Sequence, residues 1–136
     1  MQPVIIENDA MRIGAIYKLA RVVYAETLGR SLVAAEALCS MIANLHYKTG
    51  RALSDIAQDE NLFESLHENS ARHPAIDIDA NRRDFQMCLR TVRRMANGLL
   101  PDSVMGATRF HRTENLPEWA VNAGYIMEID GMLFYL

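Results

Sequence analysis

The stretch that decides the fold reads Ala20-Arg21-Val22-Val23-Tyr24-Ala25-Glu26-Thr27-Leu28-Gly29. Apolar residues recur here at three- and four-residue steps, which predicts the last turns of an amphipathic helix running from Asp9 to Leu28. Gly29 can adopt the left-handed conformation that ends a helix, and Asp9 is suited to the N-cap. The apolar face comprises Ile13, Ile16, Tyr17, Ala20, Val23, Tyr24 and Thr27.

Glu26 falls in the last turn of this helix, where the carbonyl end is negative and a carboxylate is disfavoured. The negative helix end and the apolar neighbours both favour the neutral, protonated form of this side chain. A carboxylic acid that keeps its proton near neutral pH can act as a general acid. The alternative is an ordinary solvated glutamate at a helix edge.

Composition indicates one globular domain over the 136 residues, because half of them are hydrophobic and no segment is of low complexity. The net charge of -3 implies no broad basic surface, which argues against nucleic acid as a partner. A cluster of arginines is expected on the solvated face of one helix. It comprises Arg82, Arg83, Arg90, Arg93 and Arg94.

Cysteine and histidine usage gives no sign of a metal or another cofactor. Cys39 and Cys88 lie in apolar helical patterns and are expected to be buried free thiols, although a disulfide between them stays open. The histidines show no paired metal-ligand spacing such as HExxH. They are His46, His67, His73 and His111.

The N-terminus has no basic start followed by an apolar run, so no signal peptide is visible. No segment is long and apolar enough to predict a membrane span. The chain therefore works in the cytoplasm, leaves it by a route that the sequence does not encode, or is a truncated form of a longer protein.

Two further helices are predicted. The first runs from Ser31, a candidate N-cap, to Tyr47 and is ended by Gly50. Its short connection to the preceding helix predicts a helical hairpin, in which Glu26 and the start of this helix face the same opening. The second runs from Ile78 to Asn97. For this helix Asp79 is a possible cap, and Gly98 ends it.

The segment between these helices, residues 51–77, is mixed. It contains one possible helical turn at Ser54–Ala57, a loop or short helix at Asn61–Leu66, and an irregular stretch at Arg72–Ile78. Loops of this size in compact domains are often functional.

The C-terminal part changes to a strand pattern. Residues Ala107–His111 are expected to be extended, and Leu116–Ala120 to form a turn that leads into a helical turn. Asp130-Gly131 between the apolar runs Tyr125–Ile129 and Met132–Tyr135 is a strong hairpin signal. The predicted class is α+β, mostly α, with a short C-terminal β-hairpin.

Four motifs, in this order and spacing, resemble the SleB/CwlJ-type cell wall hydrolases, the spore cortex-lytic enzymes and their bacterial and phage relatives. The resemblance covers residues 16–135, and Phe63 matches the phenylalanine of a Q-F-S motif in that family. The motifs are Ala20–Gly29 with the helix reaching Asn44, then Ala96–Gly98 with Pro101-Asp102 and Gly106–His111, then Pro117–Trp119, then Ile129–Tyr135.

The resemblance implies a small lysozyme-like helical domain, a single catalytic domain over residues 1–136, in which Glu26 is the catalytic residue. The chain departs from the family pattern at three places. Arg30 replaces an acidic residue, Ala34-Ala35 replaces a glycine-glutamine pair, and Met132 replaces a histidine.

The implied substrate is the glycan strand of peptidoglycan, and the implied reaction is that of a lytic transglycosylase. Glu26 would protonate the departing glycosidic oxygen and then accept a proton from the hydroxymethyl group of the same sugar, which closes an anhydro ring. Hydrolysis would usually need a second carboxylate. Candidates for it are Glu64, Glu114 and Glu118.

Candidate substrate-binding residues are Tyr24, Phe63, His111 and Trp119. Aromatic rings stack on sugars, and Phe110 and Tyr135 could also do so, although core packing is the alternative for each ring.

Three polar side chains have more than one possible role. His111 could bind substrate, orient Glu26 or be structural. Arg30 could pair with Glu26, which would oppose the acid role. Asn44 could cap its own helix or reach a backbone group.

Three alternatives to a glycan-cleaving enzyme stay open: a non-catalytic glycan-binding or assembly module, a helical protein-interaction domain, and a peptidoglycan amidase. An enzyme of this kind without a visible signal peptide would act in the cell wall or periplasm after delivery by a phage lysis apparatus or a secretion machine.

Overall fold

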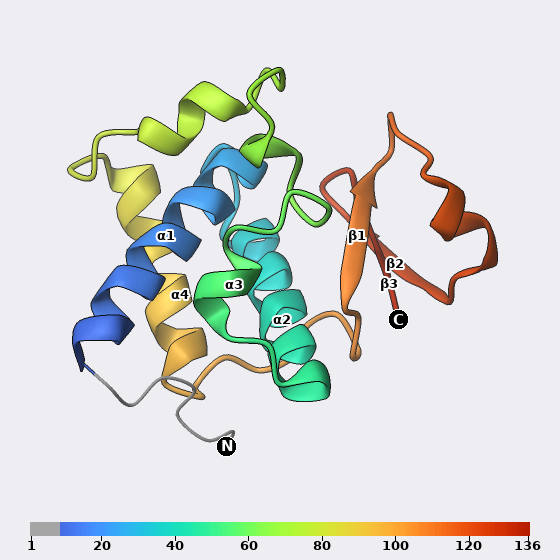
Figure 1. Cartoon of the computed structure of the whole chain (residues 1–136), viewed down its shortest axis with the longest axis horizontal. Helices are drawn as coiled ribbons and strands as arrows, with labels where there is room; N and C mark the ends of the chain where they lie inside the picture. Colours follow the sequence, from blue (N-terminus) through green and yellow to red (C-terminus); the bar gives the residue numbers. More distant parts are fainter. Residues whose placement is uncertain (1–8) are drawn as a thin grey trace.

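The computed structural model describes residues 9–136, and Figure 1 shows helices on one side and a small sheet formed by the C-terminal part on the other. The expectation about a signal peptide rests partly on residues 1–8, and the predicted cap rests on the side chain of Asp9; both lie outside what the structure describes. No helix within the described part is long and apolar enough to cross a membrane.

The first two helices form the predicted hairpin. Helix α1, Asp9–Thr27, ends with two residues in the left-handed region, Leu28 at φ 56° and Gly29 at φ 64°. Helix α2, Leu32–Thr49, begins at the predicted N-cap, because the Ser31 hydroxyl accepts a hydrogen bond from the Ala34 N–H at 3.1 Å. Gly50, at φ 74°, ends it as expected.

Helix α4, Arg83–Ala96, begins later than predicted. The proposed cap, Asp79, instead accepts the N–H of Asn81 at 2.9 Å within a turn. Aspartate side chains close such local turns as readily as they cap helices, so the predicted start at Ile78 was wrong. The arginine cluster on α4 is exposed, as expected, and Gly98 at φ 71° follows the helix end.

Three short helices fill the segment between α2 and α4. They are α3, Leu53–Ile56, which matches the predicted turn, and the 3₁₀ helices η1, Glu64–Leu66, and η2, His73–Asp77. The expectation of irregular structure at Arg72–Ile78 was wrong. Pro74 occupies the first turn of η2, where its missing N–H costs no hydrogen bond.

The C-terminal sheet has three antiparallel strands in the order β1-β3-β2. Strand β1, Arg109–Arg112, pairs with β3, Met132–Tyr135, which forms a hairpin with β2, Tyr125–Ile129. Asp130 and Gly131 both have positive φ, 47° and 80°, as the turn signal requires. The helical turn predicted before β2 is η3, Glu118–Asn122. The α+β class with a C-terminal hairpin is therefore confirmed.

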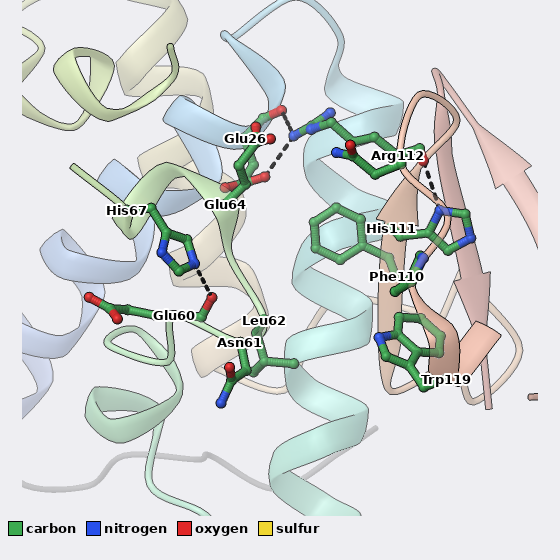
Figure 2. A pocket seen from close by; sticks show the side chains of 12 residues that line it. Glu26, Glu60, Asn61, Leu62, Glu64, His67, Phe110, His111, Arg112 and Trp119 are labelled. Atoms are coloured by element: carbon green, nitrogen blue, oxygen red, sulfur yellow. Dashed lines mark hydrogen bonds and ion pairs between the residues drawn. The ribbon is translucent and has the colours of Figure 1, made fainter. Parts of the chain in front are cut away.

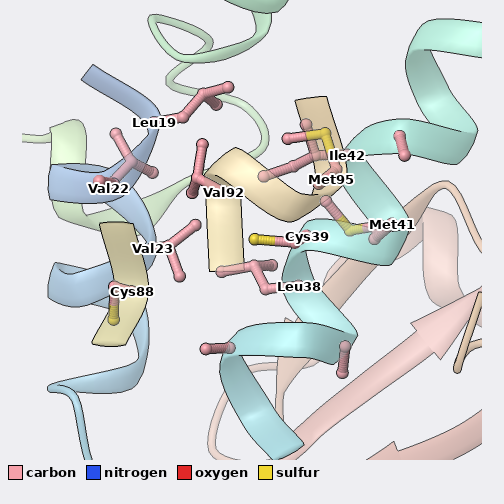
Figure 3. Packing of buried hydrophobic residues seen from close by; sticks show 14 of the residues in the cluster. Leu19, Val22, Val23, Leu38, Cys39, Met41, Ile42, Cys88, Val92 and Met95 are labelled. Atoms are coloured by element: carbon pink, nitrogen blue, oxygen red, sulfur yellow. The ribbon is translucent and has the colours of Figure 1, made fainter. Parts of the chain in front are cut away.

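The core lies where α1, α2 and α4 meet (Figure 3). Cys39 and Cys88 are buried free thiols in it, as predicted. The sheet shares the same cluster through Phe110, Met132 and Phe134, so the strands are held against the helices by continuous apolar contact. That the whole chain is one catalytic domain stays a prediction.

Candidate active site

Glu26 lies at the C-terminal end of α1 with 1% of its surface exposed. The Ser65 N–H, on η1, donates to its Oε2 at 2.8 Å, and the Arg112 Nη2, on β1, donates to its Oε1 at 2.7 Å. Each carboxylate oxygen therefore receives one protein donor, and Figure 2 shows Arg112 reaching Glu26. Helix, 3₁₀ turn and sheet thus meet at one carboxyl group.

Two arginines also cover the negative end of α1. The Arg72 Nη1 donates to the carbonyls of Ala25 at 3.3 Å and Glu26 at 3.0 Å, and the Arg112 Nη2 donates to the Glu26 carbonyl. Cations at this end of a helix offset its dipole. Burial and the neighbouring Arg112 lower the pKa of Arg72, which still keeps its charge. The sequence-based expectation considered the helix alone and missed both arginines.

Glu26 and Arg112 form part of the wall of a first pocket, of about 230 Å³, between η1 and the sheet. Of the predicted substrate-binding residues, His111 and Trp119 line this pocket. Glu60 and Glu64 line it as well, whereas Glu114 and Glu118 are exposed and do not line it. The remaining lining residues are Asn61, Leu62, His67, Phe110, Asn115 and Pro117.

A second pocket, of about 380 Å³, lies on another side of Glu26. Glu26 and Arg112 line it too, so the buried ion pair separates the two hollows. Its other lining residues are Thr27, Leu28, Arg30, Ser31, Ala34, Arg72, Asp130 and Met132.

Trp119 is held by three neighbours. The Arg109 guanidinium carbon lies 4.5 Å from the centre of its ring, and the Tyr135 and His111 rings contact it edge-on at 5.1 Å and 5.8 Å between centroids. Arginine over an aromatic face and edge-to-face ring pairs are both attractive arrangements. The indole is thus fixed in orientation at the pocket wall.

His111 does not hydrogen-bond Glu26. Its Nε2 and the Tyr135 hydroxyl are 2.8 Å apart, and its Nδ1 lies 2.7 Å from the Arg112 carbonyl oxygen. Figure 2 shows its ring on the opposite side of β1 from Phe110 and Arg112, as strand alternation requires. His111 therefore steadies the strand that carries Arg112.

Two predicted binding residues lie outside the pockets. The ring of Phe63 is fully buried and packs against Phe110 with centroids 6.4 Å apart. The Tyr24 hydroxyl donates to Asp84 at 3.3 Å, and its ring packs against Phe85. Both side chains support the core, and the structure gives neither of them access to a ligand in the two pockets.

The other polar side chains have defined positions. Arg30 is not paired with Glu26; it is exposed and lines the second pocket. The Asn44 side chain reaches a backbone group, since its Nδ2 donates to the Ala107 carbonyl at 3.1 Å and to Asp102 at 3.2 Å. Met132 is buried at the edge of the second pocket. Among the described residues, no group of three or more histidine, cysteine, aspartate or glutamate side chains is arranged to hold a metal ion.

Comparison with known proteins gives a result only at the level of structure. No protein-family model and no curated protein sequence matches the chain. The catalytic domain of the germination-specific lytic transglycosylase SleB from Bacillus anthracis superposes with a TM-score of 0.69 over 90% of this chain and 93% of that one, at 18% identity. The catalytic domain of Bacillus cereus SleB gives the same TM-score over 91% of each chain, at 17% identity.

This chain has the fold of the SleB catalytic domain. The matched part covers between 90% and 93% of every chain compared, so it is nearly the whole of each. At this identity the similarity establishes the arrangement of helices and strands. Which residues act, and on what, has to be argued from the site itself.

Proposed function

We propose that the chain is a peptidoglycan-cleaving lytic transglycosylase in which Glu26 is the only general acid and base. The observation that carries this proposal is a carboxyl group 1% exposed, hydrogen-bonded on both oxygens, and lining two adjoining pockets. The SleB-like fold supports peptidoglycan as the substrate, because the structural relatives are catalytic domains of a lytic transglycosylase.

The hydrogen bonds at Glu26 leave room for a substrate. A carboxylate offers about four acceptor sites, and the Ser65 N–H and Arg112 occupy one on each oxygen. A free site on either oxygen can accept a hydrogen bond from a sugar hydroxyl, and the protonated carboxyl group can donate its hydrogen to a glycosidic oxygen.

The reaction would follow in two proton transfers. Glu26 gives its proton to the departing glycosidic oxygen as the bond to the anomeric carbon breaks. The carboxylate, held by Arg112 and the Ser65 N–H, then takes the proton of the hydroxymethyl group of the same sugar, whose oxygen bonds to the anomeric carbon. Because this nucleophile belongs to the substrate, no second carboxylate has to activate water.

Glu64 is the carboxylate that hydrolysis would use, since it alone of the three sequence candidates lines the first pocket. Its Oε2 lies 3.5 Å from the Arg72 Nε, and the side chain is 44% exposed. If the reaction is transglycosylation, we expect the Glu64→Gln variant to keep most of the wild-type cleavage activity.

A non-catalytic glycan-binding module is the second candidate, and the Glu26–Arg112 ion pair favours it. A buried ion pair of this kind can hold three elements together without any chemistry.

Delivery to the cell wall or periplasm by a phage lysis apparatus or a secretion machine remains part of the proposal, and fractionation of cells that express the native reading frame tests it.

The deciding experiment incubates purified sacculi with wild-type protein, Glu26→Gln, Glu64→Gln and Glu128→Gln. Glu128 lies on β2, is exposed and lines neither pocket, so it controls for loss of one negative charge. We expect wild type and the Glu128 variant to release soluble muropeptides alike, and Glu26→Gln to be slower by about 10²–10⁴-fold. Binding without release by the wild type would support the non-catalytic module instead.

A further inference from the structure

We propose that the second pocket is a carboxylate-binding subsite for the stem peptide of peptidoglycan, with Arg30 as its main contact. This inference rests on the proposed substrate and goes beyond it, because it predicts which form of peptidoglycan the protein prefers. It concerns the 380 Å³ pocket beside Glu26, which shares Glu26 and Arg112 with the first pocket but is not lined by Trp119.

The cations of this pocket outnumber its anions. Arg30, Arg72 and Arg112 line it together with two carboxylates, those of Glu26 and Asp130. Arg112 is paired with Glu26 and Arg72 with Glu64. Arg30 takes part in no ion pair with any residue in the described part of the chain. Its guanidinium is therefore available to an anion entering the pocket.

Two further features point the same way. Helix α2 begins at the pocket wall with Ser31 and Ala34, and its first turn holds no acidic residue, so the positive end of an 18-residue helix lies at the hollow with only the Ser31 hydroxyl as a side-chain cap. Arg112 is 7% exposed and donates to Glu26 through Nη2. Its buried Nε has no hydrogen-bond partner within residues 9–136. The pocket thus contains more donors than its own carboxylates use.

The chemistry of peptidoglycan supplies a matching anion. The stem peptide is attached to the lactyl group of the muramic acid, next to the glycosidic bond, and carries free carboxylates. A muramic acid placed with its bond at Glu26 would direct this peptide into a neighbouring hollow. Guanidinium–carboxylate pairing adds both orientation and affinity, so Arg30 would fix the sugar that carries a peptide.

The test compares intact sacculi with sacculi whose carboxyl groups have been converted to neutral amides. The variants are Arg30→Ala, Arg30→Glu, Asp130→Asn and Arg90→Ala. Arg90 is exposed on α4 and lines neither pocket, which makes it a matched control for the loss of a positive charge. The readout is the initial rate of fragment release at low substrate concentration.

On intact sacculi we expect Arg30→Ala to be slower by about two- to five-fold, Arg30→Glu slower still, and Asp130→Asn faster. On amidated sacculi the wild type should no longer be faster than Arg30→Ala and Arg30→Glu, so that all variants release fragments at similar rates. Equal losses on both substrates, no loss at all, or the same loss in Arg90→Ala would overturn the subsite.

A binding measurement separates this inference from the proposed function. The dipeptide L-Ala-γ-D-Glu, titrated into labelled protein, should shift the backbone resonances of Arg30 and Ser31, and its amidated form should not. If these shifts occur in a protein that cleaves no sacculi, the subsite stands and the proposed function fails. If the shifts are missing, the subsite is wrong whatever the cleavage result.

Discussion

The Nη2 atom of Arg112 lies 2.7 Å from Oε1 of Glu26 and also donates to the Glu26 backbone carbonyl. Both side chains are at least nine-tenths buried. Removing one partner of a buried ion pair leaves the other uncompensated, which costs about 3–5 kcal/mol. We expect Arg112→Ala to lower the free energy of unfolding by that amount, measured by urea denaturation.

The double variant Glu26→Gln/Arg112→Met measures the coupling free energy between the two side chains. The double variant should lose less free energy of unfolding than the two single variants lose together, because it leaves no buried charge without a partner. Arg94→Ala is the matched control, since its 2.9 Å pair with Glu36 is partly exposed and should contribute about 0–1 kcal/mol. Simple additivity of the two substitutions at Glu26 and Arg112 would show that the pair does not hold the site together.

Gly29 makes a close approach that a side chain would prevent. A Cβ there would lie 2.7 Å from the Asp84 Cβ and 2.9 Å from the Tyr24 Cε1, and its φ of 64° is strained for any L-residue with a side chain. We expect Gly29→Ala to lower the free energy of unfolding by about 2–3 kcal/mol.

Gly50→Ala is the control for Gly29→Ala, because its φ is also positive, 74°, and a Cβ there meets nothing within 4 Å. It should cost only about 1 kcal/mol. Equal losses in thermal or urea unfolding would mean that the contact between Gly29 and α4 contributes nothing.

The buried thiols predict a loss of stability in alkali. Burial raises the pKa of Cys88 to about 11 from its usual 9.0, and burial also raises the pKa of Cys39. The unfolded chain ionises first as pH rises, so this contribution is complete below about pH 9 and is lost progressively toward pH 11.

The urea midpoint should therefore fall between pH 9 and 11, and less steeply in a Cys39→Ala/Cys88→Ala variant. Native protein at pH 8 should also react with a thiol reagent far more slowly than unfolded protein, because the thiolate is the reactive form. Fast reaction under native conditions would show that these thiols are accessible.

Trp119 is the single tryptophan of the chain and lines the first pocket. Its fluorescence should therefore change when soluble glycan fragments bind, and Trp119→Ala should weaken that binding by about ten-fold because a large stacking surface is lost. Trp119→Phe should retain part of the affinity. If calorimetry shows that the alanine variant binds glycan fragments as tightly as wild type does, the glycan binds elsewhere.

Local signals in the sequence predicted helix ends and the hairpin turn correctly where a residue acts within its own short segment. Ser31 at the start of α2, Gly50 at its end and Asp130-Gly131 in the hairpin each have the conformation or hydrogen bond expected of them. The start of α4 was wrong because Asp79 could satisfy either a turn or a cap, and only the packed structure decides between them.

The surroundings of Glu26 could be predicted only in part. Its place in the last turn of α1 follows from periodicity, but Arg72 and Arg112 lie 46 and 86 positions further along the chain. One signal was available for Arg112. Strand alternation places it on the same face as Phe110, and an arginine on a core-facing position requires a buried partner.

The central claim is that one carboxyl group cleaves the glycan strand without an attacking water. The most direct measurement digests sacculi in water enriched in heavy oxygen and weighs the fragments, with Glu26→Gln in parallel. We expect anhydro ends that carry no heavy oxygen, and fragment release by the variant slower by about 10²–10⁴-fold. Reducing ends labelled with heavy oxygen, or fragments released by Glu26→Gln at the wild-type rate, would contradict it.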